Sequence, residues 1–434
     1  MNDTPHLPVN RKILRLAIPS IAANITTPLL ALVDTAIVGH MGSELYIAAI
    51  AVGGVMFNML YWLFSFLRGG TSGLSAQACG ANDSRASTLV LRRSLIVASG
   101  AGILMVLLQQ PVFLLLSWFL DAGRETTALA SLYFHILIYG APAVLGNYAM
   151  SGWFLGMQNS KMLLWVSLVI NIVNILSSLL LVYGLDMGIA GVATGSLIAQ
   201  WTGFATGFLF LRRYRLTSTP LADILRWKEL KRFFSINLDV MLRTMCMIAV
   251  TLWFTRAGSR QGPLILAVNT MLMQLFLLFS YMMDGFAFAG EALVGKFVGA
   301  HDISSLRLCV RRLFVWGAIW AAFFTLLYVV GGEEFLGLLS NDSNVIAASR
   351  EYFIWALTVP FAGFAAFAWD GVFIGATMTR GLLLSIFGAM VTFFITYLFL
   401  YPAMGNHALW LAFILYLIMR GILQTLIFIR HRWE

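Results

Sequence analysis

The pentapeptide Gly152-Trp153-Phe154-Leu155-Gly156 returns as Gly371-Val372-Phe373-Ile374-Gly375 in the second half of the chain. Three more signals recur in the same order, at separations from 216 (42 to 258) to 219 (152 to 371) residues. They are Gly42-Ser43 with Gly258-Ser259, Gly80-Ala81-Asn82-Asp83 with Gly299-Ala300-His301-Asp302, and Arg92-Arg93 with Arg311-Arg312. A separation of about half the chain indicates a duplicated domain and not a solenoid of short repeats.

The composition is that of a membrane protein. Hydrophobic residues make up 60% of the chain and charged residues only 11%, whereas a soluble domain averages roughly 25% charged residues. Most apolar stretches exceed the ~20 residues that a helix needs to cross a bilayer, and their length and lack of strict alternation exclude a porin-type barrel. We therefore predict an all-α polytopic membrane protein with twelve transmembrane helices, near residues 13–37, 47–70, 89–112, 126–155, 161–183, 188–211, 233–255, 264–290, 308–330, 345–375, 380–401 and 406–429.

The basic residues predict the orientation of these spans. With the N-terminus inside, most of the 28 Lys and Arg residues, Arg420 among them, fall on the inner side, as the positive-inside rule requires. Arg243 is the one basic residue that we place within a span. An even number of spans per half makes the two repeats parallel, and a duplicated membrane domain is typical of a transporter with its substrate site between the repeats. The net charge of +9 thus reflects topology and not a nucleic-acid partner.

These observations predict the domain organisation and the location. We expect an N-terminal six-helix lobe at 11–211, a cytoplasmic linker at 212–232 and a C-terminal six-helix lobe at 233–430. Residues 223–231 of the linker form either a basic amphipathic stretch on the membrane surface or a plain linker with topogenic charges. The polar segment Met1–Asn10 runs directly into a predicted full-length span, and we expect no cleavable signal peptide from this pattern. We expect a monomer in a bacterial-type inner membrane, with both termini cytoplasmic.

Ionisable groups inside spans cost roughly 2.5–3.5 kcal/mol each on insertion scales, so each one is a functional candidate. Asp34 is a lone acid in the outer half of the first span, with no basic residue within helical reach. Because apolar surroundings disfavour the charged form of a carboxyl, Asp34 could take up a proton and release it when water arrives. The alternative is an acid at the interface that contacts water among the lipid headgroups.

Two asparagines of the fifth span are candidate partners of Asp34. Asn171 and Asn174 are three residues apart and share one helix face. They could hydrogen-bond to Asp34 if the fifth span packs on the first. They could equally join neighbouring helices without any role in coupling.

The second half carries a polar cluster near the inner side, which is a candidate substrate or ion site. Asp239 and Arg243 are four residues apart and are expected to pair. Asp284 and Glu291 share one face of the eighth span, and Arg68 stands at the position equivalent to Asp284 at a separation of 216 residues, so the two could meet across a central cleft. The alternative for the whole group is a static network. The cluster consists of Asn237, Asp239, Arg243, Asp284, Glu291 and Asp370.

The remaining features favour a transporter over an enzyme. Pro142 and Pro360, in the fourth and tenth spans, predict helix kinks, and the glycine pairs of the opening pentapeptides predict close helix packing. The chain has no P-loop, H-E-x-x-H or G-x-S-x-G pattern. Its three cysteines show no metal-binding spacing. We expect no enzymatic activity, no cofactor and no metal.

The motifs resemble those of the multidrug and toxic compound extrusion (MATE) family. The first-half signature is Val33-Asp34-Thr35-Ala36-Ile37-Val38-Gly39-His40-Met41-Gly42, followed by Gln77-Ala78-Cys79-Gly80-Ala81-Asn82-Asp83 and by residues 188–200 of the sixth span. The second half resembles the DNA-damage-inducible (DinF) branch, in the segments that contain Asn237 to Arg243, Asp284 to Glu291, Asp370 to Thr377, and Gly405 to Trp410. The resemblance covers nearly the whole chain.

The resemblance implies two six-helix lobes around a central cleft and export of organic compounds by antiport with protons or sodium. The family's acid in the first span falls on Asp34. Asn174 matches the family pattern in the fifth span, but Ser178 stands where many relatives carry an Asp. A sodium site would lack this second acid, so we favour protons. The substrates would be amphipathic, cationic or lipophilic small molecules. The alternatives are sodium-coupled antiport and a flippase for a lipid-linked precursor.

Overall fold

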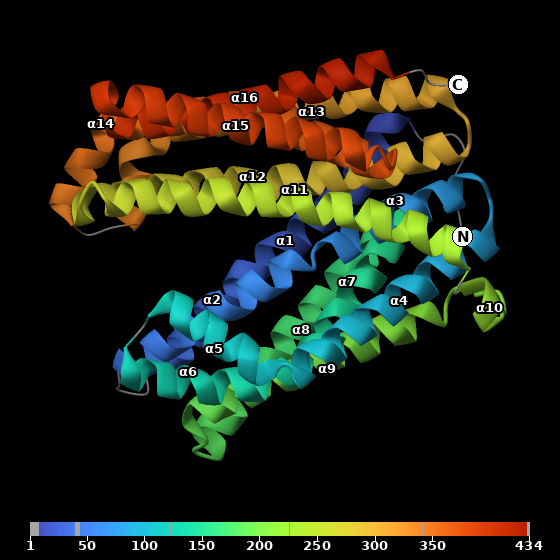
Figure 1. Ribbon diagram of the computed structural model, residues 1–434, viewed down its shortest axis with the longest axis horizontal. Helices are drawn as coiled ribbons and strands as arrows, with labels where there is room; N and C mark the ends of the chain where they lie inside the picture. The colour runs from blue at the N-terminus through green and yellow to red at the C-terminus, as the bar shows by residue number, and fades with distance from the viewer. Residues whose placement is uncertain (1–7, 40–43, 122, 225, 340–341, 432–434) are drawn as a thin grey trace. The chain divides into compact units, whose positions relative to one another are not determined.

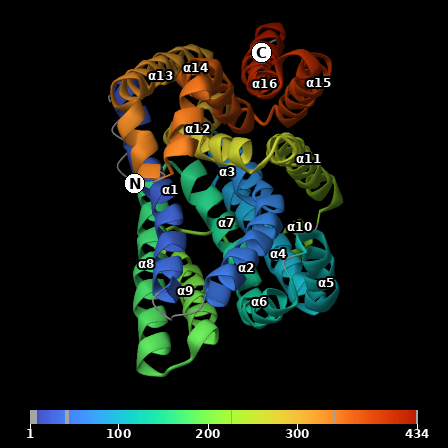
Figure 2. The ribbon, with the colours of Figure 1, turned by 90° about the vertical axis from the view of Figure 1, so that its left-hand side faces the viewer.

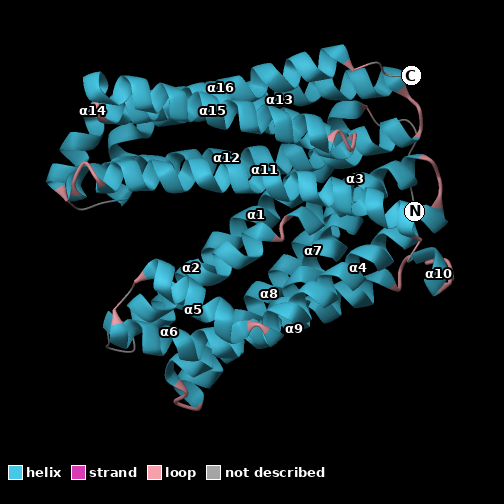
Figure 3. Ribbon diagram, viewed as in Figure 1, coloured by secondary structure: helices cyan, strands magenta, loops and turns pink. Residues whose placement is uncertain are grey.

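The computed structural model describes residues 8–39, 44–121, 123–224, 226–339 and 342–431. All regular structure in these ranges is helical, without a strand (Figure 3). The predicted all-α fold is therefore confirmed. The end of the first-span motif, residues 40–42, lies outside the described residues.

The chain divides into two compact units. One comprises Ala22–Asn237, and the other comprises Leu238–Glu434 together with Met1–Ile21. We call them the 22–237 unit and the 238–434 unit. The first helix, α1 (Val9–Gly39), therefore contributes its beginning to the 238–434 unit and the rest to the 22–237 unit. Its beginning packs on Gly285, where a Cβ would stand 3.1 Å from the carbonyl oxygen of Ala17.

The helices of the 22–237 unit follow the predicted spans, several of them interrupted. Neighbouring helices α8 and α9 lie side by side in Figures 1 and 2. After α1 come α2 (Glu44–Leu63), α3 (Phe66–Gly80), α4 (Ser84–Leu107), α5 (Gln109–Leu120), α6 (Arg124–Leu137), a 3-10 turn, α7 (Ala141–Gly156), α8 (Ser160–Leu179), a π turn, α9 (Gly188–Leu211) and α10 (Leu221–Ile224).

The helices of the 238–434 unit are longer and uninterrupted. Helices α15 and α16 form an adjacent pair that both views show (Figures 1 and 2). The elements are α11 (Trp227–Ser259), which begins in the other unit, α12 (Pro263–Gly299), α13 (Ile303–Leu339), α14 (Ser343–Gly375), α15 (Thr379–Met404) and α16 (Asn406–Arg430).

Ten helical segments among the described residues are long and apolar enough to cross a membrane. Each coincides with one of the twelve predicted spans, so the count is confirmed for ten. The other two predicted spans coincide with α1 and α9, which are helical over 31 and 24 residues. Helix α1 carries Asp34, and α9 carries Ser196, Thr194 and Gln200.

The repeated glycines bring two pairs of helices into backbone contact. A Cβ on Gly152 of α7 would stand 2.2 Å from the carbonyl oxygen of Arg68 in α3, and one on Gly371 of α14 would stand 2.1 Å from that of Ala287 in α12. Gly156 and Gly375 make the corresponding contacts with the carbonyls of Ser72 and Glu291, at 2.6 Å each. The predicted close packing is confirmed. The same crossing occurs once in each half of the duplicated chain.

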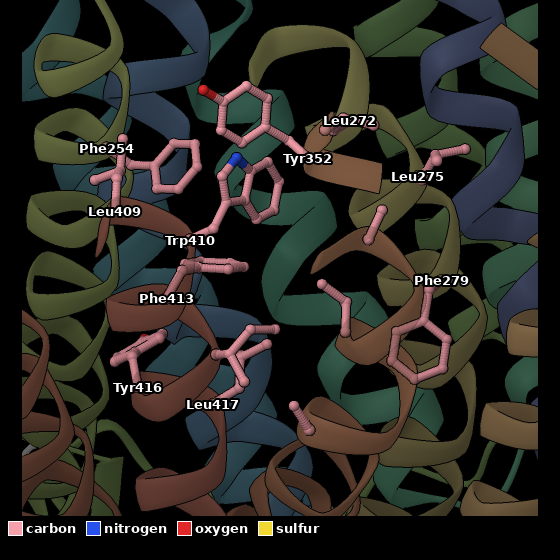
Figure 4. Close-up of a cluster of buried hydrophobic side chains, with 14 of the residues drawn as sticks. Phe254, Leu272, Leu275, Phe279, Tyr352, Leu409, Trp410, Phe413, Tyr416 and Leu417 are labelled. Carbon is pink, nitrogen blue, oxygen red and sulfur yellow. The ribbon is translucent and has the colours of Figure 1, made fainter. Parts of the chain in front are cut away.

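An aromatic core fills the 238–434 unit, and Figure 4 shows its side chains converging around Trp410. A polar contact lies within this core, because Asn269 and Asn406 exchange hydrogen bonds at 2.8 and 2.9 Å, and the Trp410 indole also donates to Asn269. Buried amides that bond to each other avoid the cost of unpaired polar groups. The pair joins the beginning of α16 to α12, which explains the Asn406 and Trp410 of the sequence motif.

The two prolines differ in their effect on the helices. Pro142 lies in the first turn of α7, directly after the 3-10 turn Ile138–Gly140, so the fourth predicted span is interrupted there. Proline fits the first turn of a helix because its missing N–H has no intrahelical partner in that position. Pro360 lies inside α14, which remains one continuous helix. A kink at Pro360 stays a prediction.

Candidate functional site

Asp34 lies in a small polar group within the 22–237 unit. Its side chain is buried, with 8% of its surface exposed. Its polar neighbours are Ser196 of α9 and Asn174 of α8, and Nδ2 of Asn174 donates to Oγ of Ser196 at 2.7 Å. The predicted meeting of Asp34 with Asn174 is therefore observed. Ser196 was not predicted as a partner; the signal available was its place in the motif at residues 188–200 of the sixth predicted span.

Three polar atoms in and next to the group around Asp34 have no hydrogen-bond partner among the described residues. Oδ1 of Asp34, Oδ1 of Asn174 and Oγ of Ser178 are buried without a hydrogen-bond partner among the described residues. An ionised carboxylate only accepts hydrogen bonds, whereas a protonated carboxyl also donates one. A protonated Asp34 would therefore donate as well as accept in this group, where the Ser196 hydroxyl and the Asn174 amide are the neighbouring donors.

Asn171, the second predicted partner, is not among the side chains that act on Asp34. It lies three residues before Asn174 on α8 and is only partly buried. Three residues correspond to 300° of helix rotation and not to a full turn. The two side chains therefore differ by about 60° in direction around the helix axis.

Asp370 is the centre of the polar cluster in the 238–434 unit. Its Oδ2 accepts hydrogen bonds from Arg243 of α11 and, at 2.7 Å, from Nη2 of Arg420 in α16. Its Oδ1 accepts from Nε2 of Gln424 at 2.9 Å. Arg420 is almost completely buried and lies over the rings of Tyr416 and Phe367. Every oxygen of this carboxylate is paired, so charge is held in place here instead of being exchanged.

Comparison with known proteins identifies the family of this chain. The sequence model of the MatE family matches residues 19–180 and 236–400, one match in each half of the chain. The protein belongs to the MATE family. The DNA damage-inducible protein F of Escherichia coli K12 is 36% identical over 419 residues, which cover 96% of this chain and 91% of that protein. The chain is thus a multi-pass MATE transporter of the DinF type.

More distant relatives share the MATE fold. A probable multidrug resistance protein NorM of Chromobacterium violaceum is 22% identical, over 96% of this chain and 92% of that one. A Vibrio cholerae MATE transporter superposes with a TM-score of 0.87 at 16% identity, covering 98% of both chains. A transporter of the MOP superfamily from Pyrococcus furiosus gives 0.81 at 18% identity, covering 96% and 94%.

The predicted pairing of Arg243 with Asp239 is wrong. Arg243 binds Asp370 of α14, and the Asp239 carboxylate accepts a hydrogen bond from Thr379 of α15 at 2.9 Å. Residues four apart on one helix are neighbours. Asp370 lies on another helix, is buried and already receives a second guanidinium and an amide. It therefore offers Arg243 a better buried site than Asp239, the partly exposed acid on its own helix.

Arg420 was predicted to lie on the inner side but is buried inside α16. It falls within the predicted span 406–429, and an arginine inside a span requires a partner. That requirement was the available signal for the contact with Asp370. Asp284 acts on Arg420 electrostatically, and Glu291 is buried where α12 crosses α14. Asp284 thus joins the predicted cluster, and Gln424 is an additional member that the sequence analysis missed.

Asn237 does not belong to the Asp370 cluster. It lies at the end of the 22–237 unit, where its Nδ2 donates to the carbonyl of Phe233 and its side chain packs on Gly70 of α3. A Cβ on Gly70 would stand 2.3 Å from Oδ1 of Asn237. The absent side chain at Gly70 therefore makes room for this amide.

The equivalence of Arg68 with Asp284 is also wrong. At the glycine crossings, Arg68 holds the position that Ala287 holds in the second half, at a separation of 219 residues. The sequence comparison used a separation of 216, about one helical turn less. The repeat therefore no longer supports a contact between Arg68 and Asp284, and this contact stays a prediction. Among the described residues, no group of three potential metal ligands comes together.

Proposed function

We propose that this MATE transporter exports amphipathic, cationic or lipophilic small organic molecules in exchange for protons, and that Asp34 carries the proton. The observation that supports this proposal is the burial of the Asp34 carboxyl among neutral side chains, with one of its oxygens lacking a hydrogen-bond partner among the described residues. A carboxyl in such surroundings is stable when protonated, and its ionised form requires water or a cationic substrate.

The side chains next to Asp34 fix the surroundings in which it would take up and release a proton during transport. Asn174 and Ser196, which are bonded to each other, hold a fixed polar surface beside the carboxyl. When the protein opens to the proton-rich side, Asp34 takes up a proton and joins this surface as a donor. When it opens to the other side, water stabilises the ionised form and the proton leaves. Export results if substrate and proton occupy the protein in alternation.

Protons are favoured over sodium because the group contains one carboxylate. Among the described side chains that act on Asp34, the others are neutral, namely Ser196 and Asn174. A dehydrated sodium ion needs several oxygen ligands and a compensating negative charge. The Asp370 carboxylate, the other central acid, already receives two guanidinium groups. Neither group therefore offers the paired acids that would favour sodium.

The orientation follows from the distribution of basic residues. We propose that both termini lie in the cytoplasm and that the protein resides in a bacterial-type inner membrane, with the basic residues of the inter-helix connections on the inner side. Cysteine accessibility at introduced terminal sites in intact cells would test this orientation.

The decisive experiment is transport by purified protein in liposomes. Ethidium movement is measured with a pH gradient alone and then with a sodium gradient alone. We expect the pH gradient to drive transport, Asp34→Asn to abolish it, and Glu125→Gln, an exposed acid in the first turn of α6, to leave it unchanged. Transport driven by sodium alone, or normal transport by folded Asp34→Asn protein, would contradict the proposal.

A further inference from the structure

Two neighbouring arginines of α4 fix the linker to the inner end of the 22–237 unit. Arg92 donates to the carbonyl oxygens of Thr217 and Thr219, at 3.4 and 2.8 Å. Arg93, which is buried, donates to the carbonyls of Asp223 and Ile224 at 2.8 and 2.9 Å. Both guanidinium groups are thus satisfied by backbone oxygens of the segment that follows α9.

The duplicated arginines of α13 have no such segment. Arg311 and Arg312 correspond to Arg92 and Arg93 in the repeat, at a separation of 219 residues. Both are exposed. Within the described ranges, neither makes a hydrogen bond or salt bridge, although guanidinium groups bond strongly to anionic oxygens. The Arg311-Arg312 pair therefore keeps the guanidinium donors of the motif but, among the described residues, has no counterpart of the linker carbonyls that accept from Arg92 and Arg93.

The surface around Arg311 and Arg312 is the end of a bilayer-facing stripe. Val315 follows them by four and three residues, so the arginines and Val315 lie on neighbouring positions of one helix side. Exposed apolar side chains continue along this side at intervals of three or four residues. They are Val315, Ile319, Phe323, Leu326 and Val330, and Leu308 adjoins the arginines from the other direction.

We propose that Arg311 and Arg312 bind the phosphate of an anionic phospholipid whose acyl chains lie along the exposed stripe of α13. The lipid phosphate takes the place that the linker carbonyls hold beside Arg92 and Arg93. A guanidinium at the end of an apolar helix side stands where the hydrocarbon gives way to headgroups, and anionic headgroups attract basic residues there. The lipid phosphate thus accepts hydrogen bonds from the guanidinium groups, and the acyl chains cover the exposed apolar side chains of α13.

The adjacent charged groups leave these arginines available. Asp302, the nearby acid at the start of α13, accepts hydrogen bonds from Ser304 and from the backbone N–H of Ser305, and it interacts with Lys12 of α1. Arg307, one turn before Arg311, is also exposed and adds positive charge. The surface is therefore basic, which selects an anionic lipid over a zwitterionic one.

Lipid binding is tested by thermal unfolding of the purified full-length protein in detergent, with added phosphatidylglycerol, phosphatidylcholine or inorganic phosphate. We expect phosphatidylglycerol to raise the midpoint of the wild-type protein. The double variant Arg311→Gln/Arg312→Gln should need roughly tenfold more of this lipid for the same shift. The control Arg260→Gln, an exposed arginine between α11 and α12, should respond as the wild type does.

Three results would overturn the proposal. The double variant could respond to phosphatidylglycerol as the wild type does, phosphatidylcholine could raise the midpoint equally, or inorganic phosphate alone could reproduce the shift. The single variant Arg312→Gln provides the same comparison if the double variant unfolds without lipid. Transport is not part of the readout, so the result does not depend on the proton-coupling proposal.

Discussion

Nη2 of Arg420 donates to Oδ2 of Asp370 at 2.7 Å, although both residues lie inside helices apolar enough to cross a membrane. Arg243 reaches the same oxygen from α11. One carboxylate therefore joins α11, α14 and α16, and it compensates two cations. Removing the acid leaves two buried guanidinium groups unpaired, whereas removing either arginine leaves the acid with one partner.

Asp370→Asn should consequently destabilise the protein more than Arg243→Gln does. Loss of a partner from a buried ion pair costs about 3–5 kcal/mol, and the asparagine strands two charges. Thermal unfolding in detergent measures the difference. Adding Arg420→Met to Asp370→Asn should restore part of the loss, because it removes one stranded cation. Equal losses from Asp370→Asn and Arg243→Gln would show that Asp370 does not hold both arginines.

Asn174 and Asn171 should differ in their effect on transport. Asn174→Leu removes the amide that faces Asp34 and Ser196, so we expect the proton-driven rate to fall by about tenfold, the value of one buried hydrogen bond. Asn171→Leu, three residues away on α8, should keep the wild-type rate. Initial rates of ethidium transport under a pH gradient provide the comparison. If the two variants lose the same activity, Asn174 has no special role beside Asp34.

Two glycines of α14 should respond in opposite ways to substitution by alanine. A Cβ on Gly371 would stand 2.1 Å from the Ala287 carbonyl oxygen, whereas one on Gly363 makes only ordinary contacts from 3.5 Å. Gly371→Ala should cost about 1–3 kcal/mol by forcing α12 and α14 apart. Gly363→Ala should be neutral or stabilising, because alanine favours helix. Unfolding midpoints that fall equally in both variants would rule out this crossing.

The cap of α13 should lose its stability in acid. Hydrogen bonds from Ser304 and Ser305 lower the pKa of Asp302 below its usual value of 3.8. The contribution of the cap is therefore complete above about pH 4 and is lost as the pH falls through the lower pKa of the folded state. At neutral pH, Asp302→Ala should destabilise the first turn by about 0.5–2 kcal/mol.

Amide hydrogen exchange in the first turn of α13 measures this effect. The difference between the wild-type protein and Asp302→Ala should shrink below the pKa of Asp302. The matched cap Asp83 of α4, which accepts from the N–H of Ala86, should be unaffected by the Asp302 substitution. A difference that is the same at pH 3 and at pH 7 would show that the carboxylate charge does not contribute.

Patterns within one helix predicted the structure well where backbone geometry decides. The spacing of Gly152 and Gly156 predicted close packing because small side chains at that interval expose one strip of backbone. Asp34 was identified because a lone acid in an apolar span is unusual, and Asn174 was found as its neighbour. In each case the sequence contains the reason, either the absence of a side chain or the cost of a buried charge.

Partners on different helices could not be predicted in the same way. Arg243 had an acid four residues away in sequence, and the choice of Asp370 instead depends on how α11 is rotated about its axis. The flanking signals aligned Arg68 with Asp284, whereas the glycine crossing aligns it with Ala287. This shift of three residues is less than one helical turn. Because such a shift leaves the aligned residues near the same side of the helix, the hydropathy pattern hardly changes and does not reveal the error.

The arginines that hold the linker also bear on how the protein is made. Every contact of Arg92 and Arg93 with the linker carbonyls lies before residue 225. Synthesis proceeds from the N-terminus, and domains generally fold as units in that order. These contacts of the 22–237 unit can thus form while most of the 238–434 unit is still being translated. The 22–237 unit can therefore be largely folded before the helices of the later unit are complete.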